Sequence, residues 1–96
     1  MRTHRPLPPL AGDHPMLQQL LAVQLPEKIQ TMAAEWLNQL LQAQERDSLY
    51  YMAGASSGYA LGIWAAGAVE KHNYERLFEV YKQAACARAK EKGWAW

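Results

Sequence analysis

Residues 48–69, SLYYMAGASSGYALGIWAAGAV, decide the fold because they are the longest stretch of the chain without a formally charged side chain. At 100° per residue, a helix over this stretch places its bulky residues on one side, a face suited to a core: Leu49, Met52, Ala60, Ile63 and Trp64. The opposite side has almost no side chains, because it consists of Gly54, Gly58, Gly62 and Ala65. A helix without charges is normally central and buried. We therefore expect this helix at the centre of a bundle, with a shallow groove along its glycines.

The same stretch is long enough to span a membrane, and its Gly-x-x-x-Gly spacing lets helices touch in lipid. However, most of its residues are Ala, Gly, Ser and Tyr, and Tyr59 would lie near the centre of the bilayer. A spanning helix is made predominantly of strongly apolar residues. The first residues also lack the apolar segment of a signal peptide. We therefore predict a buried helix of a soluble, cytoplasmic protein without membrane association.

Two helices are predicted before this stretch. A short helix over 15–23 has Asp13 placed as its cap and Pro15 in its first turn. Pro26 ends it and opens a longer amphipathic helix, which runs to residue 44 or 45. The apolar face of this second helix contains Ile29, Met32, Ala33, Trp36, Leu37, Leu40 and Ala43.

A bend at 45–48 separates the second helix from the charge-free third helix, which Asp47 or Ser48 caps. Gly67 supplies the left-handed residue that ends the third helix after Ala66. A fourth helix starts at Glu70 and is closed by Gly93. Its predicted apolar face contains Tyr74, Leu77, Phe78, Tyr81, Ala84 and Ala85.

These segments predict an all-α fold, a small helical bundle in which a short N-terminal helix precedes three main helices, the last two forming an αα-hairpin. The 96 residues, half of them apolar, suffice for one domain. We expect a proline-rich extended arm (1–14), a helical domain (15–93) and an aromatic C-terminal tail (94–96). The single cysteine excludes an internal disulfide, as is usual in a reducing cytosol. A net charge of +1 gives no general attraction to nucleic acid or anionic membranes.

Side chains capable of catalysis or metal binding are scattered along the chain. The soft metal ligands, none of which has the spacing of a zinc site, are His4, His14, His72 and Cys86. Lys82 and Lys90 would favour a thiolate at Cys86, but no histidine lies near it in sequence to act as a base. No phosphate-binding glycine loop is present. We therefore predict that the protein is not an enzyme and uses no metal or cofactor.

The glycine side of the third helix is the candidate interaction surface. Each glycine inside a helix costs about 1 kcal/mol relative to alanine, and close approach of another backbone would offset that cost. Two alternatives remain: the second or fourth helix of the same chain fills the groove, or another chain does, either a second copy or a larger protein. The two tryptophans of the tail either bind a partner or fold back on the core. The predicted partner-binding residues are Tyr51, Gly54, Gly58, Gly62, Ala65, Trp94 and Trp96.

We therefore predict a non-enzymatic protein-interaction module, an adaptor or inhibitor that docks on a larger cytosolic protein or forms a homodimer. In its size and its Ala- and Trp-rich character, the chain is similar to accessory proteins of phages and mobile elements, without a shared motif. The segment Arg5-Pro6-Leu7-Pro8-Pro9-Leu10 resembles ligands of SH3 domains, but it lacks the proline that usually follows the last leucine. The alternative function is a small DNA-binding transcriptional regulator that uses the fourth helix. Acidic residues interrupt the basic residues of that helix, so nucleic acid is the less favoured partner.

Overall fold

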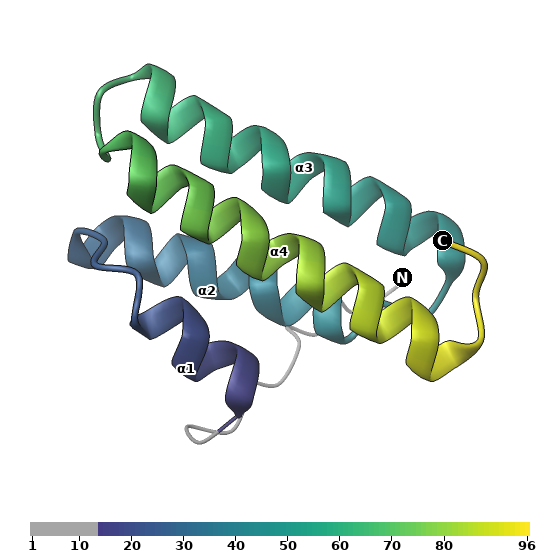
Figure 1. Ribbon diagram of the computed structural model, residues 1–96. Coiled ribbons are helices and arrows are strands. Elements are labelled where there is room, and N and C mark those ends of the chain that lie inside the picture. Colours follow the sequence, from purple (N-terminus) through teal and green to yellow (C-terminus); the bar gives the residue numbers. More distant parts are fainter. Residues whose placement is uncertain (1–13) are drawn as a thin grey trace, which may run out of the picture.

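The computed structural model describes residues 14–96, which form four helices in a small all-α bundle (Figure 1). These helices are α1 (Pro15–Leu21), α2 (Glu27–Leu41), α3 (Arg46–Ala65) and α4 (Lys71–Lys92). No strand occurs in that part of the chain. The predicted fold class is therefore confirmed, with α3 and α4 as the αα-hairpin. Except for His14, the predicted arm and its SH3-ligand-like motif lie outside the described residues.

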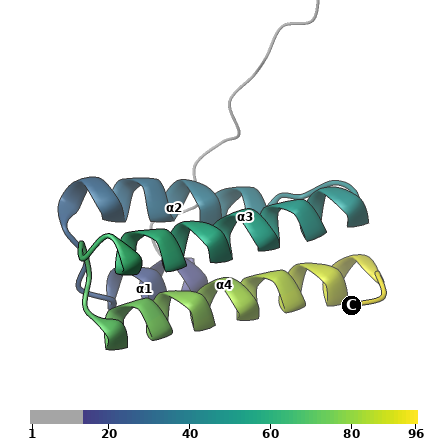
Figure 2. The ribbon, with the colours of Figure 1, turned by 90° about the horizontal axis from the view of Figure 1, so that it is seen from above.

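Helices α2 and α4 lie side by side and separate the other two helices (Figure 1). Helix α3 packs on both of them from one side, and α1 packs on both from the opposite side without contacting α3. The most extensive contact between described helices joins α3 and α4. Seen from above, α3 lies nearest to the viewer and no other described helix crosses it (Figure 2). One side of α3 therefore faces away from the bundle.

The most deeply buried helix is α4 rather than α3, which corrects the expectation drawn from the missing charges. Helix α4 contributes seven buried residues: Leu77, Val80, Tyr81, Ala84, Ala85, Arg88 and Ala89. Helix α3 contributes only three: Leu49, Ser56 and Ala60. Burial follows the apolar area that a helix offers, and the charged side chains of α4 other than Arg88 keep their charges at the surface. Because the second side of α3 consists of glycine and alanine, burying that side as well would remove little apolar area from water.

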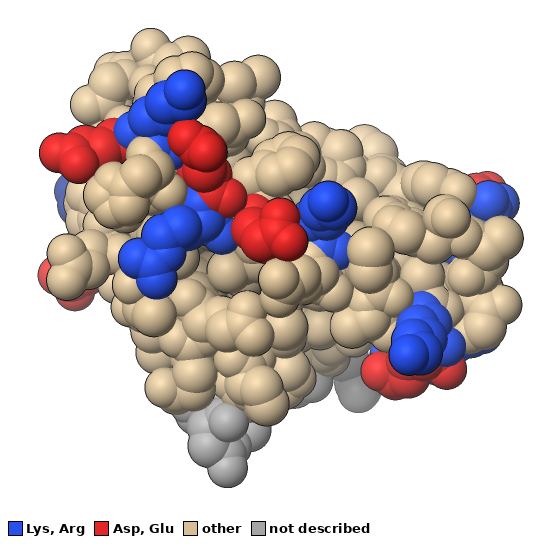
Figure 3. Space-filling model, in the orientation of Figure 1, with Lys and Arg blue, Asp and Glu red and all other residues tan. Residues whose placement is uncertain are grey.

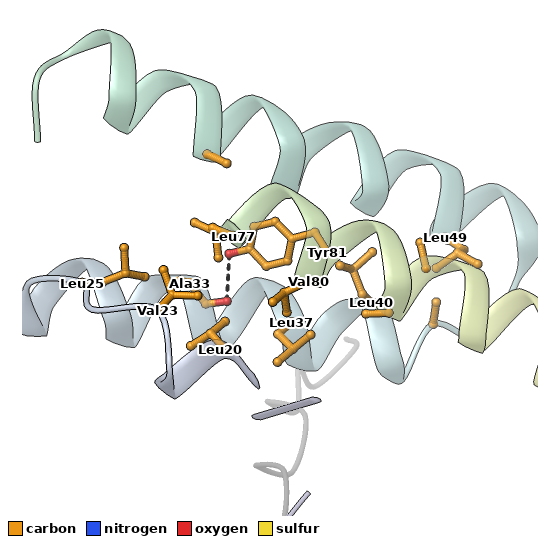
Figure 4. Packing of buried hydrophobic residues seen from close by; sticks show 14 of the residues in the cluster. Leu20, Val23, Leu25, Ala33, Leu37, Leu40, Leu49, Leu77, Val80 and Tyr81 are labelled. Carbon is orange, nitrogen blue, oxygen red and sulfur yellow. Dashed lines mark hydrogen bonds between the residues drawn. The ribbon is translucent and has the colours of Figure 1, made fainter. Parts of the chain in front are cut away.

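The core fills the space between α2 and α4, and residues of α1 and α3 close it (Figure 4). The hydroxyl of Tyr81 donates a hydrogen bond of 2.9 Å to the carbonyl of Ala33, so this fully buried phenol has its partner. Two residues of the predicted apolar faces of α2 and α4 are exposed, since Met32 is 44% exposed and Phe78 is 38% exposed. Each lies at the edge of the apolar stripe of its helix, where the neighbouring helix no longer covers it.

The starts of α1 and α3 differ from the predictions. The cap of α1 is His14, whose Nδ1 accepts a hydrogen bond of 3.1 Å from the amide of Met16. The predicted cap, Asp13, lies outside the described residues. Helix α3 follows Glu45 and therefore starts before the two predicted caps, Asp47 and Ser48. No side chain caps the first turn of α3, so its start is set by the preceding extended residue.

The ends of α3 and α4 confirm the predictions made from glycine. Gly67 and Gly93 have positive φ angles of 77° and 71°. After Gly67, the amide of Ala68 donates to the carbonyl of Ile63 at 2.9 Å, which is the hydrogen bond of a Schellman motif. After Gly93, the amide of Trp94 donates to a carbonyl of the last turns of α4 at the same distance. This turn directs the C-terminal tail back along the bundle.

Candidate functional site

The side of α3 that faces away from the bundle is the candidate site, and we call it the α3 outer face. It consists of Tyr51, Gly54, Gly58, Leu61, Gly62 and Ala65, all of which are exposed. A Cβ atom placed on any of the three glycines would meet no neighbouring atom within 4 Å. Of the two alternatives left open by the sequence, the one in which α2 or α4 fills the groove is therefore excluded. Tyr51 is 69% exposed and Leu61 is 48% exposed, so two large side chains stand beside the bare glycines.

A second set of small residues lies on the opposite side of α3, where α2 and α4 pack. Ser56 and Ala60 are fully buried there, and small side chains let neighbouring helices approach closely. The hydroxyl of Ser56 donates to the carbonyl of Ala53 at 3.1 Å, so it needs no partner on another helix. The close contact of α3 within the chain therefore uses Ser56 and Ala60, and it leaves the glycines uncovered. Sequence reasoning did not single out Ser56, although it lies one turn before Ala60.

A row of aromatic side chains extends the apolar surface from α3 onto α4. Trp64 stacks on Tyr74 with ring centroids 4.8 Å apart, and Tyr74 meets Phe78 at 6.2 Å in a tilted arrangement. Trp64 was predicted in the core, but it is 36% exposed because it lies at the border between the two sides of α3. The row therefore adds exposed apolar surface beside the C-terminal half of α3.

The tail folds back on the domain, which is one of its two predicted alternatives. Trp94 is half-buried and packs against the core. Trp96 stacks on Tyr50 with ring centroids 4.9 Å apart, and the guanidinium of Arg46 lies 4.7 Å from the centroid of the same ring. The Nε of Arg46 also donates to the carbonyl of Ala95 at 2.9 Å. Both indoles therefore have contacts within the chain, Trp96 with the first turns of α3 and Trp94 with the core.

Charges occur only at the two ends of α3. Arg46 and Asp47 lie in its first turn, and Glu70 and Lys71 follow the loop after its last turn. The visible surface over α3 carries no charge between these ends, whereas charged side chains gather over the N-terminal half of α4 (Figure 3). A partner on the α3 outer face would therefore be recognised by shape and apolar contact rather than by ion pairs.

One charged side chain lies inside the bundle. Arg88 is 8% exposed, its Nε donates to the carbonyl of Ala43 at 2.9 Å, and its guanidinium pairs with Glu91 at 2.8 Å. Ala43 follows the end of α2, where backbone carbonyls lack helical partners. Arg88 therefore caps α2 and ties it to α4. Sequence reasoning missed this role, because the two bonded residues are far apart in the chain.

The titratable side chains of residues 14–96 form no metal site, because no three His, Cys, Asp or Glu side chains are grouped so that they could hold an ion. Burial raises the pKa of Tyr59 and Tyr81, whose hydroxyls donate to carbonyls of α2 at 3.4 and 2.9 Å. Cys86 is exposed on α4.

A hollow of about 440 Å³ between α1 and α2 is lined by Leu17, Leu21, Glu27, Gln30, Thr31, Ala34, Glu35 and Asn38.

Comparison with known proteins gives no relative: no family model, no curated protein and no solved structure matches the chain. Of the helices that residues 14–96 form, none combines the length and the apolar character needed to cross a bilayer. The α3 outer face is therefore interpreted from its own geometry and chemistry.

Proposed function

We propose that this protein is a non-enzymatic interaction module of the cytoplasm, an adaptor or inhibitor whose α3 outer face docks on another protein chain. The observation that supports this proposal is a solvent-open glycine row on a charge-free helix, beside the exposed side chains of Tyr51 and Leu61. The absence of charge along the face favours a contact made by backbone approach and apolar side chains.

Two costs in the isolated chain favour a partner at this face. Three exposed helical glycines lower the stability by about 3 kcal/mol relative to alanine, which is a large part of the roughly 5–15 kcal/mol that stabilises a typical domain. Tyr51 and Leu61 also keep much of their apolar surface in water. A partner backbone seated against the glycines would bury both side chains, at about 25 cal/mol for each Å² removed from water.

The alternative function, a regulator that reads DNA with α4, has weaker support. Seven residues of α4 face the core, and one of them is the basic residue Arg88, whose guanidinium is engaged within the chain. Glu75 and Glu79 are exposed between the basic residues of the same helix, and their charges repel phosphate. Retention of random duplex DNA at low salt, lost as salt is raised, would support this alternative over the docking proposal.

Photo-crosslinking in cells tests the docking proposal. Benzoyl-phenylalanine replaces Tyr51 in one chain and Cys86, which is exposed on α4, in a matched control chain. We expect a defined adduct with a protein chain from position 51 and none from position 86. Adding Gly58→Leu is expected to abolish the adduct by overfilling the contact, whereas Ala87→Leu, at an exposed position of α4, leaves it intact. No adduct from position 51, or equal adducts from both positions, would contradict the proposal.

A further inference from the structure

We infer that the hollow between α1 and α2 binds the proline-rich arm of the same chain, residues 1–13, as an extended segment. This α1–α2 hollow has a volume of about 440 Å³, and the proposed function does not use it. Helix α1 packs on α2 and α4 from the side opposite to α3. The inference is therefore independent of docking at the α3 outer face, which a docked arm would leave open.

Apolar side chains from two helices line the α1–α2 hollow. They are Leu17 and Leu21 of α1 and Ala34 of α2, and the other lining side chains are polar or acidic. Leu21 is 41% exposed, and the other two are half-buried. The described residues thus leave apolar surface in water at the point where two helices meet. A segment with apolar side chains would remove this surface from water.

The arm joins the fold beside the hollow. His14 caps α1 three residues before Leu17, which lines the hollow. Helices α1 and α2 run in opposite directions, so the start of α1 lies toward the C-terminal end of α2 (Figure 1). Gly12 and Asp13 directly precede this junction, and both residue types are frequent in turns. A turn there would direct the arm back along the hollow, toward the N-terminal end of α2.

The sequence of the arm suits an extended segment that lies on a surface. Pro6, Pro8 and Pro9 favour the polyproline II conformation, which has three residues per turn and rises about 3.1 Å per residue. Leu7 and Leu10 therefore share one side of the segment and lie about 9 Å apart. Because proline fixes φ, this segment loses little conformational freedom when it binds.

The length of the arm allows both leucines to lie in the hollow. Leu10 lies four residues before His14, a distance that an extended chain spans with up to about 13–14 Å. It therefore reaches the part of the hollow that Leu17 lines. Leu7 then lies about 9 Å closer to the N-terminal end of α2, toward Leu21. The spacing of the arm thus places one leucine beside each leucine of α1.

The charges of the arm and of the hollow are opposite in sign. Arg2 and Arg5 precede the leucines, and the one acidic residue of the arm lies at its opposite end. The exposed carboxylates of Glu27 and Glu35 line the hollow, and neither forms an ion pair within residues 14–96. Lys28 adjoins Glu27 in sequence but does not line the hollow. In the register above, Arg5 reaches the end of the hollow that carries Glu27, and this exposed pair acts mainly on orientation.

The covalent connection lets a small contact suffice. A short flexible connection gives the arm an effective concentration in the millimolar range at the hollow. Docking within one chain also avoids the loss of translational and rotational freedom that a separate partner would suffer. We therefore expect docking that does not depend on the protein concentration.

Paramagnetic relaxation in the full chain tests this placement. A nitroxide is attached at Thr3→Cys in an isotopically labelled Cys86→Ser chain, which lacks the native thiol. We expect strong broadening of the amides of Glu27, Gln30 and Thr31, at the N-terminal end of the hollow, and much weaker broadening on the α3 outer face. Equal broadening of both surfaces, broadening of the α3 outer face alone, or broadening of neither would overturn the inference.

Substitutions in the arm and in the hollow distinguish docking from mere tethering. Leu7→Ser combined with Leu10→Ser is expected to reduce the broadening in the hollow several-fold, whereas the control Ala11→Ser retains it. Thr31→Arg fills the hollow from an exposed position and adds a cation, so it is expected to have the same effect. Its matched control is Ala87→Arg, at an exposed position of α4. Broadening that persists in the leucine variant or in the Thr31 variant would overturn the inference.

Mixing two preparations tests whether the arm belongs to the same copy. A nitroxide-labelled chain at natural isotope abundance is mixed with an isotopically labelled chain that carries no nitroxide. Docking within one chain predicts no broadening in this mixture, and it predicts broadening in the doubly labelled chain that dilution does not change. Broadening in the mixture would assign the bound arm to a second copy and overturn the inference.

Discussion

Replacing Gly54, Gly58 and Gly62 with alanine in one chain is expected to stabilise the monomer. A Cβ atom at each position meets nothing within 4 Å, so the substitutions introduce no clash. Each alanine contributes about 0.8–1 kcal/mol through helix propensity, which gives about 2.5–3 kcal/mol for the three. In a domain of this size, 1 kcal/mol shifts the melting temperature by roughly 4–8 °C, so we expect a rise of about 10–20 °C.

Urea unfolding followed by circular dichroism measures this effect at low protein concentration, where association does not contribute to stability. The midpoint is expected to rise with an unchanged m value. Gly67→Ala is the matched control, because the φ of 77° at this position strains any other residue, so this variant is expected to lose about 1 kcal/mol. An unchanged or lowered stability of the triple variant would refute the reasoning, since it would mean that the glycines are already in close contact within the monomer.

Three further predictions concern the core and the tail. Because burial raises the pKa of Tyr81, the stability that its neutral phenol contributes is fully present below about pH 10 and falls at higher pH by up to about 1.4 kcal/mol per unit. Urea titrations in alkaline buffer are expected to show this slope in the native chain and a smaller one in Tyr81→Phe, because Tyr59, whose pKa burial also raises, is still present. Arg88→Met leaves the carbonyl of Ala43 without its donor and is expected to cost about 1–3 kcal/mol in urea unfolding. Trp94→Ala removes a half-buried indole and is expected to lower the free energy of unfolding by about 2 kcal/mol, whereas Trp96→Ala, at a more exposed position, has a smaller effect in the same assay.

Helix ends that depend on one backbone conformation could be predicted from the sequence. Gly67 and Gly93 end their helices as expected, because a residue that must adopt a positive φ is usually glycine. The cap of α1 was less predictable, because Asp and Ser are preferred caps and His14 acts here through its ring nitrogen. The distribution of small and large residues along α3 also indicated which side of this helix packs on the bundle, except at Trp64, which is exposed at the border.

The packing arrangement of the helices could not be predicted from the sequence pattern of each helix alone. Whether α3 or α4 is central depends on how well whole faces fit one another, and the missing charges of α3 carry no information on that fit. The bond from Arg88 to Ala43 joins two helices and leaves no local pattern. Leu61 did have a signal, since it lies three residues after Gly58 on the same side of the helical wheel, but it was not among the predicted partner-binding residues.

The central claim is that the glycine row of α3 is open to solvent in the isolated chain. The solvent exposure of its backbone amides tests this claim most directly. In an isotopically labelled chain, relaxation by a soluble paramagnetic complex reports how close each amide lies to solvent. We predict strong relaxation at Gly54, Gly58 and Gly62 in dilute solution and selective protection of these three amides on association, with Gly67 and Gly93 unchanged. Protection of the three amides in the dilute monomer, or equal exposure before and after association, would contradict the account.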